Sequence, residues 1–150
     1  MYRIKSLYVN KWCRGHQTLG LLFGLELNQS ISHEQNESDR TKLVHEIRLT
    51  AEGKEIHNPN PFNKSGNGNQ KQTKFETNSM HHQGFYYDAQ EDLDKKDITI
   101  LGVTPSPLSV IEAIKHKTKP IISVQWHPEE IYDTFSLKAI KLLLNTNHAE

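Results

Sequence analysis

The amino-acid sequence predicts a single α/β domain with a mixed central sheet. Two segments with helical spacing of apolar residues, Gly15–Gly24 and Phe135–Leu144, lie toward opposite ends of the chain. Between them are short apolar runs of strand length, separated by polar segments that contain Gly, Pro and Asn. Strands and helices alternate only in part, so the middle of the chain favours antiparallel pairing. A length of 150 residues corresponds to one domain, 1–150.

The first elements follow from local composition. Ile4–Asn10 favours β-structure and predicts a strand, and the apolar face of the next segment predicts a helix over Gly15–Gly24, with Gly24 as its stop. Leu25–Leu27 predicts a further short strand. The polar segment Asn28–Thr41 predicts a loop.

The later strands are predicted from short apolar or alternating runs, at Leu43–Thr50, Lys74–Asn78, Ile98–Thr104, Ser109–Ile114 and Pro120–Trp126. Ala51–Lys54 predicts a turn after the first of these runs. The segment 58–72 is rich in Asn, Pro and Gly and predicts an exposed loop. Phe135–Leu144 predicts a terminal helix.

Composition narrows the function classes. Lys plus Arg and Asp plus Glu both number 18, so zero net charge removes any bulk electrostatic argument for binding nucleic acid or an acidic membrane. A single cysteine rules out an intrachain disulfide and fits a reducing compartment. The sequence shows no signal-peptide pattern and no apolar run of membrane-spanning length. We therefore expect a cytoplasmic protein with no nucleic-acid and no membrane partner.

Cys13 is the most informative residue of the chain. The β-favouring run before it and the helical pattern after it are typical of a nucleophile elbow, where a reactive side chain projects from a sharp strand-to-helix turn. A lone cysteine is otherwise most often a small buried hydrophobic residue.

His127-Pro128-Glu129, at the end of the predicted strand 120–126, offers the partners that a cysteine nucleophile needs. Pro128 fixes the backbone between the imidazole and the carboxylate, so Glu129 can meet one ring nitrogen while the other faces the thiol. The neighbouring His81 and His82 lack a further ligand at metal-site spacing, so we expect no metal.

Four segments together resemble the class I glutamine amidotransferase superfamily. They are Cys13-Arg14-Gly15-His16-Gln17, Asn78-Ser79-Met80-His81-His82-Gln83, Val110–Ile114 and Val124–Glu129. Within the superfamily, the chain is most similar to the branch of peptidase family C26 that hydrolyses γ-glutamyl amides, the γ-glutamyl-γ-aminobutyrate hydrolase type. The resemblance implies a flavodoxin-like glutamine-amidotransferase fold and no cofactor.

The resemblance also implies roles. Cys13 would attack a γ-glutamyl amide and form a thioester, His127 would transfer protons, and Glu129 would orient His127. The backbone N–H of Arg14 would be an oxyanion donor. Residues that would bind the small-molecule γ-glutamyl substrate are Arg14, Gln17, Ser79, His81, His82 and Gln83, with Glu112 in a supporting position.

The chain departs from the family pattern in two ways. Lys11 stands where the elbow usually has glycine, and only twelve residues precede Cys13. The usual N-terminal strands and helices, with the loop that supplies a second oxyanion donor, would then be lacking. A catalytically impaired relative, or half of a split enzyme, is therefore the alternative function. Such a protein would use the open sheet edge to bind a second copy or a complementing chain.

Overall fold

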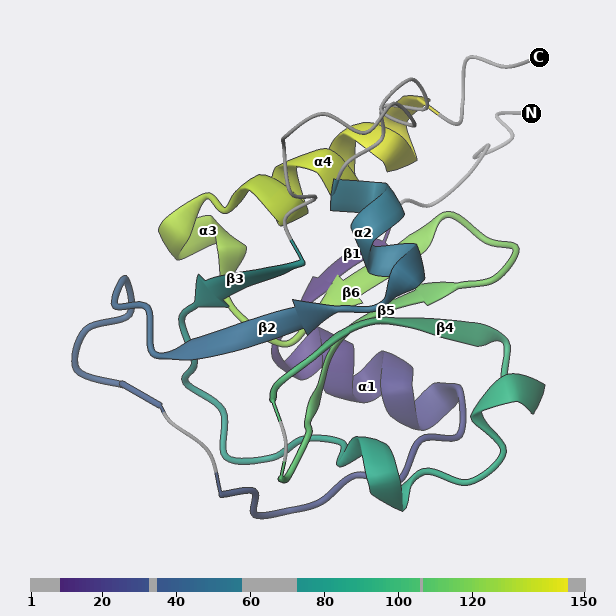
Figure 1. Cartoon of the computed structure of the whole chain (residues 1–150), viewed down its shortest axis with the longest axis horizontal. Helices are drawn as coiled ribbons and strands as arrows, with labels where there is room; N and C mark the ends of the chain where they lie inside the picture. Colours follow the sequence, from purple (N-terminus) through teal and green to yellow (C-terminus); the bar gives the residue numbers. More distant parts are fainter. Residues whose placement is uncertain (1–8, 33–34, 58–72, 106, 146–150) are drawn as a thin grey trace, which may run out of the picture.

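The computed structural model describes residues 9–32, 35–57, 73–105 and 107–145. Six strands form one sheet in the order β1-β6-β5-β4-β2-β3 (Figure 1). The strands are β1 (Val9–Trp12), β2 (His45–Leu49), β3 (Lys74–Thr77), β4 (Ile98–Val103), β5 (Ile111–His116) and β6 (Ile121–Val124). β1 and β6 are parallel and the other pairs are antiparallel, which confirms the predicted mixed sheet.

Helices cover both faces of the sheet (Figure 1). The helices are α1 (Arg14–Leu22), α2 (Ala51–His57), α3 (Pro128–Ile131) and α4 (Thr134–Asn145), with 3-10 turns η1 (Tyr87–Ala89) and η2 (Leu93–Lys95). α1 lies on one side, and α2 and α4 lie together on the other. The chain is thus a layered α/β structure.

Each face of the sheet carries its own hydrophobic core. On the α2 and α4 side, Trp126 and Phe135 are packed with buried residues of four strands. On the other side, Phe85 packs with Ile111 and Ile114 of β5. β5 is buried along nearly its whole length, which explains why its sequence is a continuous apolar run interrupted by one acidic residue, Glu112.

Two local predictions are wrong. Ala51–Lys54 is the first turn of α2 rather than a turn between elements, because Thr50 Oγ1 accepts a hydrogen bond from the Gly53 N–H at 3.1 Å and caps the helix. Leu25–Leu27 forms no strand; Leu25 is buried in the core, and its N–H donates to the Gly20 carbonyl at the end of α1.

The N-terminal strand is shifted relative to its prediction. β1 occupies Val9–Trp12, while residues 1–8 of the predicted strand, and the whole predicted loop 58–72, lie outside the described residues. The other predicted strands and the two predicted helices are present within a few residues of their expected ends.

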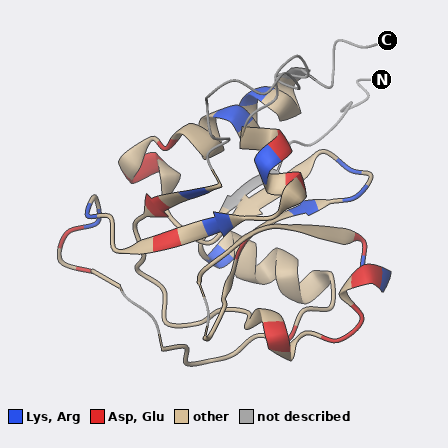
Figure 2. Ribbon diagram, viewed as in Figure 1, with Lys and Arg blue, Asp and Glu red and all other residues tan. Residues whose placement is uncertain are grey.

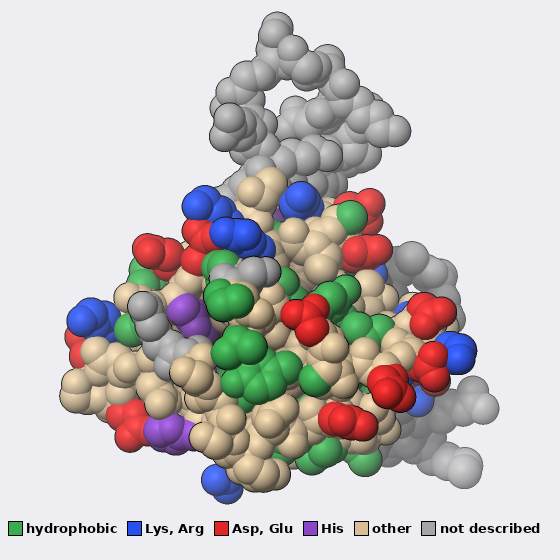
Figure 3. Space-filling model, turned by 60° about the horizontal axis from the view of Figure 1, so that its bottom comes forward, with side chains coloured by type: hydrophobic (Ala, Val, Ile, Leu, Met, Phe, Trp, Pro, Cys, Tyr) green, Lys and Arg blue, Asp and Glu red, His purple; other side chains and the backbone are tan. Residues whose placement is uncertain are grey.

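Charged side chains of both signs are interspersed over the ribbon (Figure 2). On the lower face, hydrophobic side chains gather near the middle and acidic side chains lie around them (Figure 3). In the part of the chain that the structure describes, the helices are too short or too polar to cross a bilayer.

Candidate active site

Cys13 occupies a strained junction between β1 and α1. Its backbone has φ +44° and ψ −103°, a conformation that non-glycine residues rarely adopt. Two hydrogen bonds hold it there: the Cys13 N–H donates to the Val124 carbonyl at 3.1 Å, and the Gln17 N–H donates to the Cys13 carbonyl at 3.1 Å. Strain of this kind is common at functional sites. The geometry of the elbow is therefore present, with Lys11 in the strand before it.

His127 and Glu129 lie beside Cys13. β1 and β6 run parallel with Trp12 opposite Val124, so the residues that follow both strands meet at one edge of the sheet. His127 Nδ1 lies 2.6 Å from Glu129 Oε1, and the imidazole also hydrogen-bonds to the thiol of Cys13. The structure brings together all three residues that were predicted as a catalytic group.

The tautomer of His127 follows from these partners. A carboxylate only accepts hydrogen bonds, so Nδ1 carries the proton and Nε2 is left for the thiol. The pKa of His127 is raised above its ordinary value, chiefly by the hydrogen bond with Cys13 and further by Glu129, while burial opposes the rise. The N-terminus of α1 adds a partial positive charge beside the sulfur. This arrangement suits proton transfer from the thiol to the imidazole.

Three of the predicted binding residues are linked to one another. Gln17 Nε2 on α1 donates to the Gln83 carbonyl at 3.0 Å, and His81 Nδ1 donates to the same oxygen at 2.8 Å. Both side chains are buried or nearly so. The segment after β3 is thereby fixed against the helix that follows Cys13.

The other predicted binding residues have different surroundings. Ser79 is buried, and its carbonyl accepts a hydrogen bond from the Asn36 N–H at 2.9 Å. His82 is exposed and lies 2.6 Å from Glu37 Oε1. Arg14 is exposed at the first position of α1. Their roles in binding a substrate remain predictions.

A buried polar cluster surrounds Glu112, whose side chain is fully buried on β5. His81 Nε2 lies 3.3 Å from Glu112 Oε1, and His45 Nε2 lies 3.8 Å from Glu112 Oε2. His16 is also buried; its Nε2 donates to the Ile111 carbonyl and its Nδ1 meets Ser123 Oγ at 2.9 Å. Burial lowers the pKa of His16 to about 4, so His16 is neutral.

Sequence reasoning gave no role to Asn78 or Arg40. The Asn78 side chain hydrogen-bonds to the backbone of His127, and Arg40 pairs with Glu130 at 2.9 Å beside the histidine. Asn78 stood in a quoted motif, and its place directly after a strand was the available signal. Arg40, in a polar loop, carried none.

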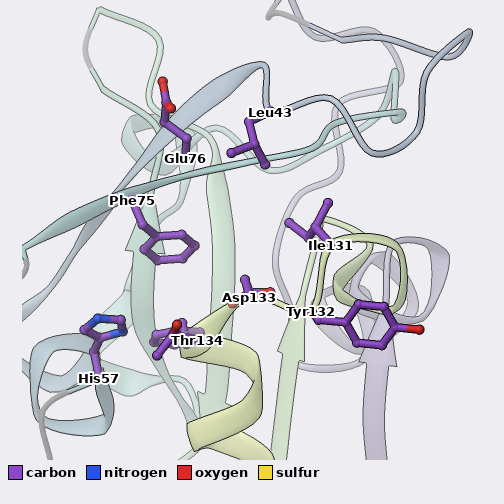
Figure 4. Close-up of a pocket in the computed structure, with 9 residues that line it drawn as sticks. Leu43, His57, Phe75, Glu76, Ile131, Tyr132, Asp133 and Thr134 are labelled. Atoms are coloured by element: carbon purple, nitrogen blue, oxygen red, sulfur yellow. The ribbon is translucent and has the colours of Figure 1, made fainter.

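A separate cavity of about 320 Å³ lies beside β3 and the start of α4 (Figure 4). His57 and Phe75 lie on one side of it, and Ile131 and Tyr132 on the other. Neither Cys13 nor His127 lines this cavity. Among the described residues, no cluster of His, Cys, Asp and Glu is arranged to hold a metal ion.

Comparison with known proteins gives one family. The sequence model of peptidase C26 matches residues 9–129. The glutamine amidotransferase-like protein YvdE of Lactococcus lactis is 27% identical over 142 residues, which cover 89% of this chain and 51% of that protein. The chain therefore spans about half the length of this relative.

Solved structures of similar fold include a GMP synthase component candidate from Thermoplasma acidophilum and a glutamine amidotransferase from Thermotoga maritima. The first has a TM-score of 0.58 at 16% identity and covers 91% of this chain and 57% of its own. The second has a TM-score of 0.49 at 14% identity and covers 93% and 49%. The first likeness confirms the type of fold that the sequence predicted.

Proposed function

Because this chain belongs to the peptidase C26 family, we propose that it is a cysteine-dependent hydrolase of γ-glutamyl amide bonds. One observation carries the proposal: the only cysteine stands at a strained strand-to-helix junction, hydrogen-bonded to a histidine that lies 2.6 Å from a carboxylate. A buried structural cysteine has no need of that backbone strain or of those partners.

In the first half of the reaction, His127 Nε2 takes the proton of Cys13, and the sulfur attacks the side-chain carbonyl carbon of the γ-glutamyl group. The carbonyl oxygen becomes an oxyanion, which the backbone N–H of Arg14 would stabilise at the start of α1. His127 then gives its proton to the amine nitrogen, the carbon–nitrogen bond breaks, and a thioester remains on Cys13.

In the second half, His127 takes a proton from water, and the resulting hydroxide attacks the thioester carbon. The carbon–sulfur bond breaks, glutamate leaves, and the proton returns to the sulfur. Glu129 keeps the proton on Nδ1 throughout, so that Nε2 is always the atom that exchanges it.

A glutamine analogue with an electrophilic diazoketone in place of the amide tests the proposal. Since the chain has one cysteine, a mass increase of one adduct on the intact protein reports on Cys13. We expect glutamine to protect the thiol, and we expect His127→Ala to slow labelling by about 10²–10⁴-fold, the usual contribution of a general base.

Iodoacetamide is the matched control, since it alkylates any accessible thiol without a glutamyl pocket. A folded protein that iodoacetamide alkylates and the glutamine analogue does not would overturn the proposal. Release of 4-nitroaniline from γ-glutamyl-4-nitroanilide then measures turnover, with Glu129→Gln expected to be slower than wild type.

A different observation favours a second function, that of an interaction partner in an assembly. β1 stands at one end of the sheet and, among the described strands, pairs only with β6. Beside it lies an apolar cavity of about 240 Å³ lined in part by Trp12, Tyr132 and Leu137. Tyr132 is 75% exposed and Leu137 is 47% exposed. An open edge beside an apolar surface suits pairing with a second copy of the chain.

The oligomeric state decides this second function. Light scattering at increasing concentration should give the mass of a dimer, and Leu137→Glu should return it to a monomer. Leu142→Glu is the matched control, because Leu142 lies on the same helix, is 43% exposed, and lines other surfaces. A monomer at all concentrations would exclude the second copy as the partner.

A further inference from the structure

Asn78 connects two distant parts of the sheet. It directly follows β3, the last strand in the sheet order, whereas His127 follows β6, which lies next to the opposite end. Three strands separate β3 from β6, so contact between Asn78 and His127 requires the sheet to curl. The Asn78 side chain is buried, with 1% of the residue exposed.

The amide of Asn78 holds both peptide groups of His127. Asn78 Oδ1 accepts the N–H of His127 at 3.0 Å, and Asn78 Nδ2 donates to the carbonyl of His127 at 3.2 Å. The same nitrogen donates to the carbonyl of Arg40 at 2.7 Å. Both donor hydrogens of the amide are thus used, and one of its acceptor sites.

His127 needs such support, since it belongs to no regular element. Its φ of −111° and ψ of 82° carry the chain from the end of β6 into the short helix α3. Strand pairing ends at Val124, and beyond it the Gln125 N–H still bonds to the carbonyl of Glu112. Further along, the backbone of His127 is held by Asn78 and by the N–H of Glu130, which donates to the His127 carbonyl at 3.1 Å.

We propose that Asn78 is a positioning residue for His127, which holds its backbone so that the imidazole stays between Cys13 and Glu129. Bonds to the N–H and to the carbonyl fix the two peptide planes on either side of the Cα atom, and the direction of the side chain follows from them. The inference rests on the proposed pairing of Cys13 with His127 as nucleophile and base. It assigns Asn78 no contact with substrate.

The pH dependence of Cys13 alkylation by iodoacetamide tests this inference. The groups that face His127 are Cys13, Glu129, and the guanidinium of Arg40, 3.5 Å from Nδ1 and itself bound to Glu130. When the imidazole is in place, it accepts the thiol proton and keeps part of the sulfur as thiolate below the ordinary cysteine range.

Asn78→Ala should move the alkylation profile toward that of a free thiol, with a midpoint near 8.5. The rate at pH 6.5 would fall about tenfold for each unit by which the midpoint rises. Thr77→Val is the matched control: it is isosteric, lies one residue earlier, and changes a fully buried hydroxyl that makes no hydrogen bond among the described residues. It should leave the profile unchanged.

Two results would overturn the inference: a wild-type profile in Asn78→Ala, or an equal shift in Thr77→Val. Should Asn78→Ala not fold, Asn78→Asp replaces it. The carboxylate can still accept the N–H of His127 but cannot donate to either carbonyl, so an intermediate shift is expected, and a wild-type profile again refutes the inference.

The test separates this inference from the proposed hydrolysis. Iodoacetamide requires no glutamyl pocket, so a shifted profile in Asn78→Ala supports the positioning role even when γ-glutamyl substrates are not turned over. His127→Ala should itself give the free-thiol profile. A wild-type profile in that variant would show that Cys13 and His127 are not paired, and the inference would fall with the pairing.

Discussion

The backbone strain at Cys13 can be measured by comparing Cys13→Gly with Cys13→Ala. Both substitutions remove the thiol and its hydrogen bond with His127, so their difference isolates the conformation of the backbone. Glycine adopts a positive φ freely, whereas alanine retains the steric conflict of any L-residue. The comparison therefore tests whether the chain is held at a φ of +44°.

The expected magnitude follows from two opposing effects. A non-glycine residue in this region costs about 1–3 kcal/mol. Glycine loses more conformational freedom on folding, which costs about 0.4–1 kcal/mol. The neighbouring bonds prevent relaxation, because Val124 holds the Cys13 N–H and Gln17 holds its carbonyl, each at 3.1 Å. Cys13→Gly should therefore be more stable than Cys13→Ala by about 1 kcal/mol.

Urea denaturation gives the readout, with the fluorescence of the buried Trp126 as the signal. With a slope of about 1–3 kcal/mol per molar urea, a difference of about 1 kcal/mol separates the two midpoints by roughly 0.3–1 M. If Cys13→Ala proves as stable as Cys13→Gly, the residue is not strained, and the argument that this junction is a nucleophile elbow fails.

The remaining predictions concern buried side chains. Gly20→Ala would place a Cβ atom 2.3 Å from Cζ of the buried Phe85 and should cost about 1–3 kcal/mol of stability in urea denaturation, with the exposed Thr18→Ala near neutral. Glu112→Ala removes the carboxylate next to His81 and should cost about 3–5 kcal/mol, whereas Glu112→Gln should cost less in the same assay. Burial lowers the pKa of His16 to about 4, while an unfolded histidine titrates near 6.5, so the unfolded state binds more protons between these values. Stability should fall by about 3 kcal/mol as the pH drops from 6.5 to 4, and His16→Gln should flatten this slope in denaturation curves recorded at each pH.

Local sequence predicted the strands well and the short helices poorly. The apolar run at β6 can hardly be anything but a buried strand, since Ile122 and Val124 are both in the core. The first turn of α2 contains Gly53, which suggested a turn. The structure gives another reason for that glycine: a Cβ atom there would lie 2.0 Å from the carbonyl oxygen of Leu101. Close packing of the helix on β4 requires glycine, and packing leaves no local pattern.

The candidate site divides in the same way. Cys13, His127 and Glu129 were predicted because strand ends, a helix start and a short motif mark them locally. Asn78 was given no role because its partner lies 49 residues along the chain and is reached only when the sheet curls. Contacts of this kind depend on strand order, which a single sequence does not reveal.

Strand order also separates two requirements of the proposed reaction. Pairing of Cys13 with His127 depends on β1, β6, α1 and Asn78, all of which are within the described residues. Turnover further requires two donors to the oxyanion, of which only the Arg14 N–H is assigned, and removal of one donor typically costs about 10²–10³ in rate. A reactive thiol and slow hydrolysis are therefore compatible in this chain. Thiolate chemistry at Cys13 tests the pairing, and γ-glutamyl turnover tests whether the oxyanion is stabilised as well.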